Sequence, residues 1–399
     1  MVSNRPCPTH LRHVQTCSIF VSVNSPALEF PCPASVSDTP PTSLDTLLHW
    51  LALQHVERLG PVRAQALREA FGTPQSIFQA SHQELSEIHP HLPEGSLRAI
   101  LNGPDLAWAR SQVEQARSMG ASILHLDHPE YPTCLRHIAS PPPILYAQGA
   151  IPLVHPRSVG LVGTRRPCPM GLEAARTFSG AWSRQGLRIV SGLALGIDEQ
   201  CHRAALESGG QTVAVLAYPL DSLGTRGARG MLAQDIALNG LVVTEHAFGD
   251  PVVPGNFVRR NRLISGLSQA VVVVQAPRGS GALITARFAL DQDREVFAVP
   301  GPAGKDLWEG NFDLLRQGAH LCATPDDLSS VMGWSRAQQE SGSGSDSPVV
   351  RLLRRGDATA EEIAVQLREP MNRLQGELVL LELSGTIVRV GGGRYALHP

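Results

Sequence analysis

The chain has 399 residues, a length that favours two to four domains at about 150 residues each. Its apolar fraction of 42% excludes wholesale disorder, and its net charge of −2 excludes a protein coated in positive charge. Seven scattered cysteines without C-x-x-C spacing exclude a disulfide framework and a zinc site. No run of 18 apolar residues and no signal peptide occurs, so we expect a cytoplasmic protein without a membrane span.

The N-terminal third divides into two parts. Residues 1–42 are rich in Pro, Ser, Thr and Cys without periodicity, and two interpretations are open: a disordered tail, or a start codon upstream of the natural one. From Leu44 apolar residues recur at helical spacing. We therefore predict an all-helical domain over 43–140.

One turn in this helical domain could bind an anion. The stretch from Leu59 to Leu67, with the break Gly60-Pro61, resembles a helix-hairpin-helix or sterile-alpha-motif unit. Such turns can hold a DNA phosphate on backbone N–H groups. The second glycine of the usual G-x-G turn is missing here, which favours a packing or protein-contact module.

From Ser158 the pattern changes to alternating strands and helices. Continuous apolar strands such as Val271–Val274 predict a parallel sheet buried on both faces. We therefore predict a doubly wound, Rossmann-like α/β domain over 141–333. The predicted strands are Val159–Val162, Arg188–Val190, Thr212–Leu216, Leu241–Thr244, Ala270–Gln275 and Glu295–Val299; the predicted helices are Leu172–Gln185, Asp198–Glu207, Met231–Leu238, Val258–Leu267 and Ile284–Asp291.

The C-terminal part reads as a linker followed by a small domain. Residues 334–348 are rich in Ser and Gly and predict a flexible linker. Three helical segments and two strands around Gly391–Gly393 then predict a winged helix over 349–399. Its recognition helix, 371–383, has one arginine against two glutamates, which suits a protein contact or a regulatory role better than a DNA major groove.

Ligands of open α/β sheets bind beyond the carboxyl ends of the strands. Glycines there let backbone N–H groups approach an anion, and the following helix N-terminus favours phosphate. Neither G-x-G-x-x-G nor G-x-x-x-x-G-K-[ST] occurs, which disfavours NAD and Walker-type ATP binding, and we expect no cofactor. The first two strands are followed by Gly163, Thr164, Arg165, Arg166, Ser191 and Gly192.

Arginines gather at these strand ends. Arg259, Arg260, Asn261 and Arg262 open a predicted helix, where three cations oppose the helix dipole unless an anion binds. Arginine forks suit phosphates and stack on bases, so we predict a positive pocket for single-stranded nucleic acid. The other arginines of this pocket are Arg165 and Arg166, Arg226 and Arg229 in a glycine-rich loop, and Arg278.

A further strand–glycine loop–helix unit follows Arg278. Ser280 and Thr285, around Gly281, could donate hydrogen bonds to phosphate. The alternative is that Ser280 only caps the helix.

Candidates for acid–base catalysis are few. Asp198 and His202 lie one helical turn apart, and Glu245 and His246 follow a strand. A capping aspartate and an exposed histidine explain the first pair equally well. We expect no catalytic residues, no metal and no enzymatic activity.

Together these residues resemble the DprA/Smf family of DNA-processing proteins, over about residues 125 to 330. The combined order of the matching motifs is specific to that family. They are Val162-Gly163-Thr164-Arg165, Val190 to Ala194 with Gly196-Ile197-Asp198 and His202, Arg260 to Ser268, Ser280-Gly281 with Leu283 to Ala286, and Val296 to Gly301.

The resemblance implies a single-stranded DNA-binding protein of natural transformation. Such a protein protects incoming DNA, loads the recombinase RecA onto it and pairs as a homodimer through the α/β domain. Arg165 and Arg260–Arg262 would line the DNA pocket. This sequence departs from the family where Leu195 replaces a basic residue and Gln275 an acidic one, and Arg226 or Arg229 would substitute for a lysine.

Two other function classes share features with this sequence. A Rossmann-like nucleotide hydrolase or phosphoribohydrolase needs a glutamate beside a P-G-G-x-G-T loop, which Pro300–Lys305 does not supply. A ligand-sensing transcription regulator would need a winged helix that reads duplex DNA, and the glutamates of 371–383 disfavour that.

Overall fold

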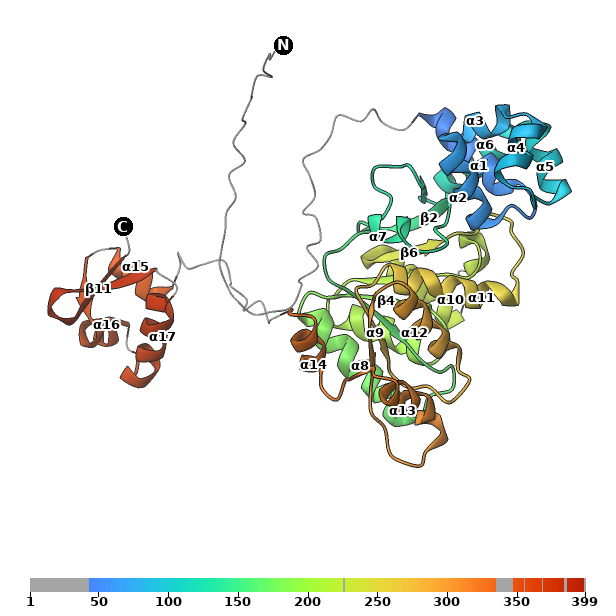
Figure 1. The fold of residues 1–399 in the computed structure, drawn as a ribbon. Helices are drawn as coiled ribbons and strands as arrows, with labels where there is room; N and C mark the ends of the chain where they lie inside the picture. The colour runs from blue at the N-terminus through green and yellow to red at the C-terminus, as the bar shows by residue number, and fades with distance from the viewer. Residues whose placement is uncertain are drawn as a thin grey trace, which may run out of the picture. The chain divides into compact units, whose positions relative to one another are not determined.

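The computed structural model describes most of the chain outside its N-terminal tail (Figure 1). The predicted tail 1–42, most of the predicted linker and Arg226 lie outside the described residues. The described ranges are 43–224, 227–334, 347–354, 356–367, 369–383 and 386–397. No helix within these ranges has both the length and the hydropathy that crossing a bilayer requires.

The N-terminal region is helical, as predicted. Ser43 caps the first helix by accepting a hydrogen bond from the N–H of Thr46, and Ser81 and Glu84 form a capping box at the fourth. Trp50 and Leu67 are fully buried between the helices. The helices are α1 (Leu44–His55), α2 (Gly60–Phe71), α3 (Pro74–Gln79), α4 (His82–Ile88), α5 (Glu94–Leu101) and α6 (Leu106–Ser118).

The helical prediction for 43–140 is wrong at its end. Strand β1 (Ser122–His125) pairs antiparallel with β2 (Ile144–Gly149), and only the short helix α7 (Thr133–Arg136) lies between them. Four residues are too few for a period-two pattern to stand out in the sequence. The α/β sheet therefore begins about twenty residues before the predicted boundary at 141.

The central sheet confirms the predicted parallel arrangement. Its order is β1-β2-β6-β5-β4-β3-β7-β8-β9; the seven strands from β6 to β9 in this order run parallel, and β2 joins β6 antiparallel. The strands β3 to β7 are almost completely buried, which explains their continuous apolar sequence. Their bounds are β3 (Ser158–Val162), β4 (Arg188–Ser191), β5 (Thr212–Val215), β6 (Leu241–Thr244), β7 (Ala270–Val273), β8 (Glu295–Ala298) and β9 (His320–Leu321).

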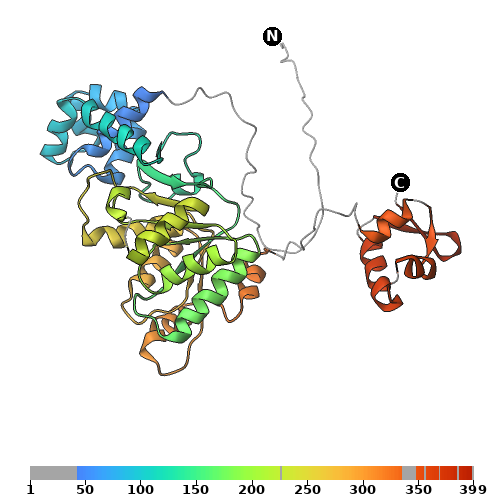
Figure 2. The same cartoon turned by 180° about the vertical axis from the view of Figure 1, so that it is seen from behind.

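Helices cover both faces of the sheet, as Figures 1 and 2 show from opposite sides. Helices α8 (Pro169–Arg184), α9 (Ile197–Glu207) and α14 (Pro325–Val331) pack on one face around Trp182. The other face shares a continuous core with the N-terminal helices. It is covered by α10 (Gly227–Asn239), α11 (Pro254–Gly266), α12 (Gly281–Asp291) and the 3₁₀ turn η1 (Leu220–Leu223). Trp308 of the turn η2 (Asp306–Trp308) packs with the first face, and α13 (Glu309–Arg316) contacts both cores.

The strand order fixes where a ligand site is expected. From β3 the chain adds β4, β5 and β6 on one side, and from β7 it adds β8 and β9 on the other. The direction of winding therefore switches between β3 and β7, and their carboxyl ends are the expected site.

The C-terminal region has its own core. Helices α15 (Pro348–Leu353), α16 (Ala360–Leu367) and α17 (Met371–Leu383) enclose buried Ile363 and Leu374. A three-stranded sheet completes it, in the order β10 (Ala358–Thr359), β12 (Arg394–Leu397), β11 (Ile387–Val390). The three helices and two of the strands match the sequence prediction, and β10 was not predicted.

Candidate nucleic-acid interface

The floor of the switch point is closed by one side chain. Gln275, which follows β7, is fully buried, and its Oε1 accepts a hydrogen bond from the N–H of Cys168 at 3.0 Å. A Cβ on Gly171 would lie 2.2 Å from the same oxygen. Because Gln275 fills the crevice between the strands, a ligand here lies above the strand ends.

Above this floor the loop after β3 carries cations. Gly163 is half-buried and Thr164 is buried, and the N–H of Thr164 donates to the carbonyl of Gln275 at 2.8 Å. Arg165 and Arg166 are both exposed. The loop therefore presents two guanidinium groups at the carboxyl ends of β3 and β7, where the strand order predicts a ligand site.

Arg165 is part of a combined cationic and aromatic surface. Its guanidinium lies 5.2 Å from the ring centre of Phe257, at the start of α11. The ring of Tyr218, from the loop after β5, lies 6.3 Å from that of Phe257, and burial raises the pKa of the Tyr218 hydroxyl while the nearby Arg229 guanidinium opposes this shift. We call Arg165, Tyr218, Arg229 and Phe257 the Arg165 platform. Guanidinium groups over aromatic rings are the chemistry that holds unstacked bases and phosphates.

Two aromatic residues of this platform were absent from the predicted site. Tyr218 follows a strand end and Phe257 directly precedes the arginine cluster. Because the chain has only four tyrosines and ten phenylalanines, an aromatic residue at a strand end was a usable indication. Arg229 was predicted in a loop but lies in the first turn of α10. Its neighbour Arg226 lies outside the described residues.

Arg260 is buried, contrary to its predicted place on the pocket surface. Its guanidinium donates to the carbonyl of Gly192 at 2.6 Å and also to the carbonyl of Val215. A Cβ at position 192 would lie 2.6 Å from the guanidinium, so only glycine leaves room for it. Burial lowers the pKa of Arg260 to about 10. Arg260 thus ties α11 to the ends of β4 and β5 from beneath.

Arg262 is also buried, in an ion pair with Glu245 after β6. Its Nη1 and Nη2 lie 2.8 and 2.6 Å from the two carboxylate oxygens, and Nε donates to the carbonyl of Ser140. Burial alone would raise the pKa of Glu245, but the adjacent guanidinium more than offsets this and lowers it below its usual value. The pair fixes α11 against β6.

The helix-dipole argument for an anion at these arginines is wrong. Helix α11 begins at Pro254, four residues before the predicted start, so Arg259 to Arg262 lie in its second and third turns. The dipole effect falls off within the first turn. Only Arg259 of this group has an exposed side chain, and it points to a separate pocket described below.

The remaining predicted residues have structural partners. Ser280 caps α12 by accepting from the N–H of Ala282, which supports the capping alternative. Arg278 is exposed but pairs with Asp313 and Glu309. The others are held as follows: Ser191 donates to the carbonyl of Leu161, Asn261 donates to the carbonyl of Gly281, Gly281 is exposed, and Thr285 is 1% exposed.

The acid–base candidates are buried as well. The Asp198 carboxylate accepts the N–H of Gly192 at 3.2 Å, and burial raises its pKa. His202 Nδ1 lies 2.7 Å from the Thr212 hydroxyl, and burial lowers its pKa to about 3. These groups shape the β4–α9 loop from inside.

Comparison with known proteins places this geometry in a family. Residues 122–333 match the family model described as DNA recombination-mediator protein A. Protein Smf of Synechocystis sp. is 35% identical over 294 residues, covering 71% of this chain and 72% of its own. DNA processing protein DprA of Bacillus subtilis is 37% identical over 219 residues, covering 53% and 71%.

A solved structure agrees. The X-ray structure of DprA from Streptococcus pneumoniae matches with a TM-score of 0.62 and 27% identity, covering 71% of this chain and 97% of that one. Both the sequence and the fold point to the same relatives. The chain belongs to the DNA recombination-mediator protein A family, which is the DprA/Smf family that its motifs resemble.

Proposed function

We propose that this chain binds single-stranded DNA at the Arg165 platform. The observation that carries the proposal is the exposed Arg165 guanidinium over the Phe257 ring, with Tyr218 beside it, at the switch-point edge of the sheet. A single strand offers both phosphates and unstacked bases to such a surface, whereas a duplex offers only phosphates. The named relatives, which are DNA processing proteins, support the same ligand class.

The neighbouring groups extend this contact. Arg166 and Arg229 supply further exposed cations, whereas the N–H of Thr164 already donates to the carbonyl of Gln275, so Gly163 and Thr164 support the loop that carries Arg165. The buried residues support this surface without contacting DNA, because they hold the loops and α11 in place. They are Ser191, Gly192, Arg260, Asn261, Arg262 and Thr285.

In this proposal the chain binds and delivers DNA without catalysing a reaction on it. Asp198 and His202 are buried and already hydrogen-bonded, so a substrate has no access to them. Glu245 is committed to Arg262. The support for this proposal is that Asp198, His202 and Glu245 are engaged in internal hydrogen bonds or an ion pair.

The wider role that we propose follows the family: protection of incoming DNA in natural transformation and loading of RecA, by a homodimer formed through the α/β domain. The domains would be the helical part of 43–140, the Rossmann-like part of 141–333 and a winged helix over 349–399 that contacts protein. The test is the rate at which RecA filaments assemble on single-stranded DNA that is coated with a single-strand-binding protein, measured with and without this chain.

The binding step is tested first, by fluorescence anisotropy of labelled single- and double-stranded oligonucleotides over a salt series. Arg165→Ala should weaken single-strand binding by about 1–3 kcal/mol, because a charged stacking contact is lost. Arg176→Ala is the matched control, since Arg176 is an exposed arginine of α8 that pairs with Glu173. Duplex preference, or equal affinities of the two variants, would contradict the proposal.

A further inference from the structure

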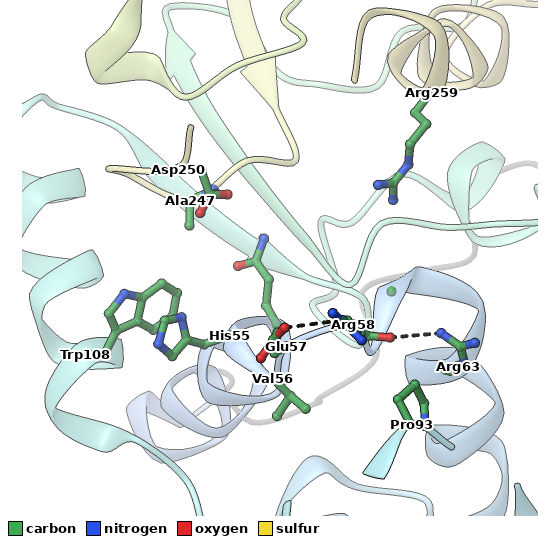
Figure 3. Close-up of a pocket in the computed structure, with 12 residues that line it drawn as sticks. His55, Val56, Glu57, Arg58, Arg63, Pro93, Trp108, Ala247, Asp250 and Arg259 are labelled. Atoms are coloured by element: carbon green, nitrogen blue, oxygen red, sulfur yellow. Dashed lines mark hydrogen bonds and ion pairs between the residues drawn. The ribbon is translucent and has the colours of Figure 1, made fainter. Parts of the chain in front are cut away.

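A second basic site lies where the N-terminal helices meet the α/β sheet. An open pocket of about 650 Å³ is lined by the α1–α2 turn, by α6, by residues that follow β6 and by Arg259 from the second turn of α11. We call it the Arg259 pocket (Figure 3). Its lining residues are Gln54, His55, Val56, Glu57, Arg58, Gly60, Arg63, Pro93, Trp108, Ala247, Asp250 and Arg259.

Three arginines converge at one end of this pocket. Figure 3 shows Arg259 pointing from α11 across the space toward Arg58 and Arg63. Arg58 pairs at 3.3 Å with Glu57, but both side chains are 77% exposed, and such pairs contribute little. Within the described residues, Arg63 and Arg259 have no carboxylate at ion-pair distance. Nη1 of Arg63 donates to the backbone carbonyl of Arg58 at 2.9 Å, and its remaining N–H groups and the Arg259 guanidinium can hold an anion.

The backbone at this end also favours an anion. Gly60, the first residue of α2, lines the pocket, and no described side chain caps that helix. The positive end of the helix dipole and its first N–H groups thus lie beside the arginines. Arg58 adopts φ +58°, a backbone conformation that side chains other than glycine rarely adopt. This is the turn that the sequence marked as a possible phosphate site.

The opposite end of the pocket is aromatic. The rings of His55 and Trp108 stack with their centres 4.0 Å apart and 16° between their planes. His55 is exposed and Trp108 is half-buried, so the pair presents a flat face to a ligand. A site with an aromatic face at one end and guanidinium groups at the other matches a nucleotide unit, which has a base and a phosphate.

Helix α11 connects this pocket with the Arg165 platform. Phe257 contributes to the platform and Arg259 to the pocket. Residues two positions apart in a helix are separated by about 3 Å along its axis and face nearly opposite sides. We propose that the Arg259 pocket holds a nucleotide unit of the same single strand, with its phosphate on the arginines and its base on His55 and Trp108. This inference rests on the proposed function.

The test compares oligothymidylates of about 6 and about 20 nucleotides, since single-strand sites commonly span 4–16 nucleotides. The double variant Arg63→Ala/Arg259→Ala should bind the short oligonucleotide like wild type and the long one about tenfold more weakly. Its salt slope for the long oligonucleotide should fall by about 1.4, from two lost phosphate contacts. The control is Arg110→Ala, an exposed arginine of α6 outside the pocket, which should leave both affinities unchanged.

A second readout uses Trp108. The long oligonucleotide should quench tryptophan fluorescence in wild type, and Trp108→Phe should lose this quenching while binding the short one normally. Trp50, Trp182 and Trp308 are buried and Trp334 is half-buried, so the contribution of Trp108 is the difference between wild type and Trp108→Phe.

Three results would overturn the inference. If the double variant binds both lengths like wild type while Arg165→Ala weakens both, the pocket is no part of the path and the proposed function stands. If wild type binds neither length, the proposed function and this inference fail together. If the double variant loses binding of free thymidine monophosphate but not of the long oligonucleotide, the pocket serves a free nucleotide.

Discussion

Individual arginines of this chain have opposite roles that their sequence positions do not distinguish. Arg165 is exposed above an aromatic ring, whereas Arg260 and Arg262 are 4% and 6% exposed. The buried pair find their partners 68 and 17 residues away, at Gly192 and Glu245. Such partners depend on how the strands assemble, so reading the cluster at 259–262 alone could not separate surface contacts from internal ties.

The ion pair of Arg262 and Glu245 predicts a pH-dependent stability. The folded state lowers the pKa of Glu245, so the pair stabilises the protein above the unfolded value of about 4.3 and loses this effect as pH falls through the folded value. Glu245→Gln should lower the free energy of unfolding by about 3 kcal/mol at pH 7, because it leaves a buried cation unpaired.

The measurement is urea unfolding of wild type and Glu245→Gln between pH 7 and pH 3. The difference should begin to shrink near the unfolded value of about 4.3 and should be lost only below the lowered folded pKa, where the wild-type carboxyl is protonated as well. Glu173→Gln, in an exposed pair with Arg176, serves as the control and should differ little at any pH. A difference that is constant with pH would exclude this role for Glu245.

At the scale of elements, the parallel strands β3 to β8 were predictable, whereas the two-residue parallel strand β9 and several boundaries were not. Continuous apolar runs identify β3 to β8 because both faces of these strands are buried. The start of α11 was missed because Pro254 and Gly255 read as a loop, although proline is common at the first helical position. Strand β1 was missed because its first two residues are not fully buried and it has only four residues.

Helix α12 offers a test of cap against ligand contact. Ser280 accepts a hydrogen bond from the N–H of Ala282, so Ser280→Ala should destabilise the protein by about 1 kcal/mol through loss of the cap. Because the hydroxyl is engaged in the cap, affinity for single-stranded DNA should stay unchanged. Thermal unfolding and anisotropy on the same samples measure both quantities. Weaker DNA binding without loss of stability would instead assign Ser280 to the DNA contact.

For the whole molecule, the buried apolar residues of the C-terminal region form a core of their own. The N-terminal helices share one apolar core with a face of the sheet, from Leu51 to Val243. This continuity explains why a pocket forms between them. Residues 349–397 have a separate core around Ile363, Leu374 and Tyr395.

The separate core predicts that residues 347–399 fold alone, although so short a chain buries only about 60% of its surface and is marginal. The fragment should show cooperative thermal unfolding by circular dichroism. It should give no duplex gel shift at physiological salt, because exposed Val365 and Leu380 suit protein contact better than phosphate.

Residues 43–334 should keep the full single-strand affinity, since the Arg165 platform and the Arg259 pocket lie within them. A duplex shift by the small fragment would make it a DNA reader, and a drop in affinity of the large fragment would place part of the strand contact in the C-terminal region.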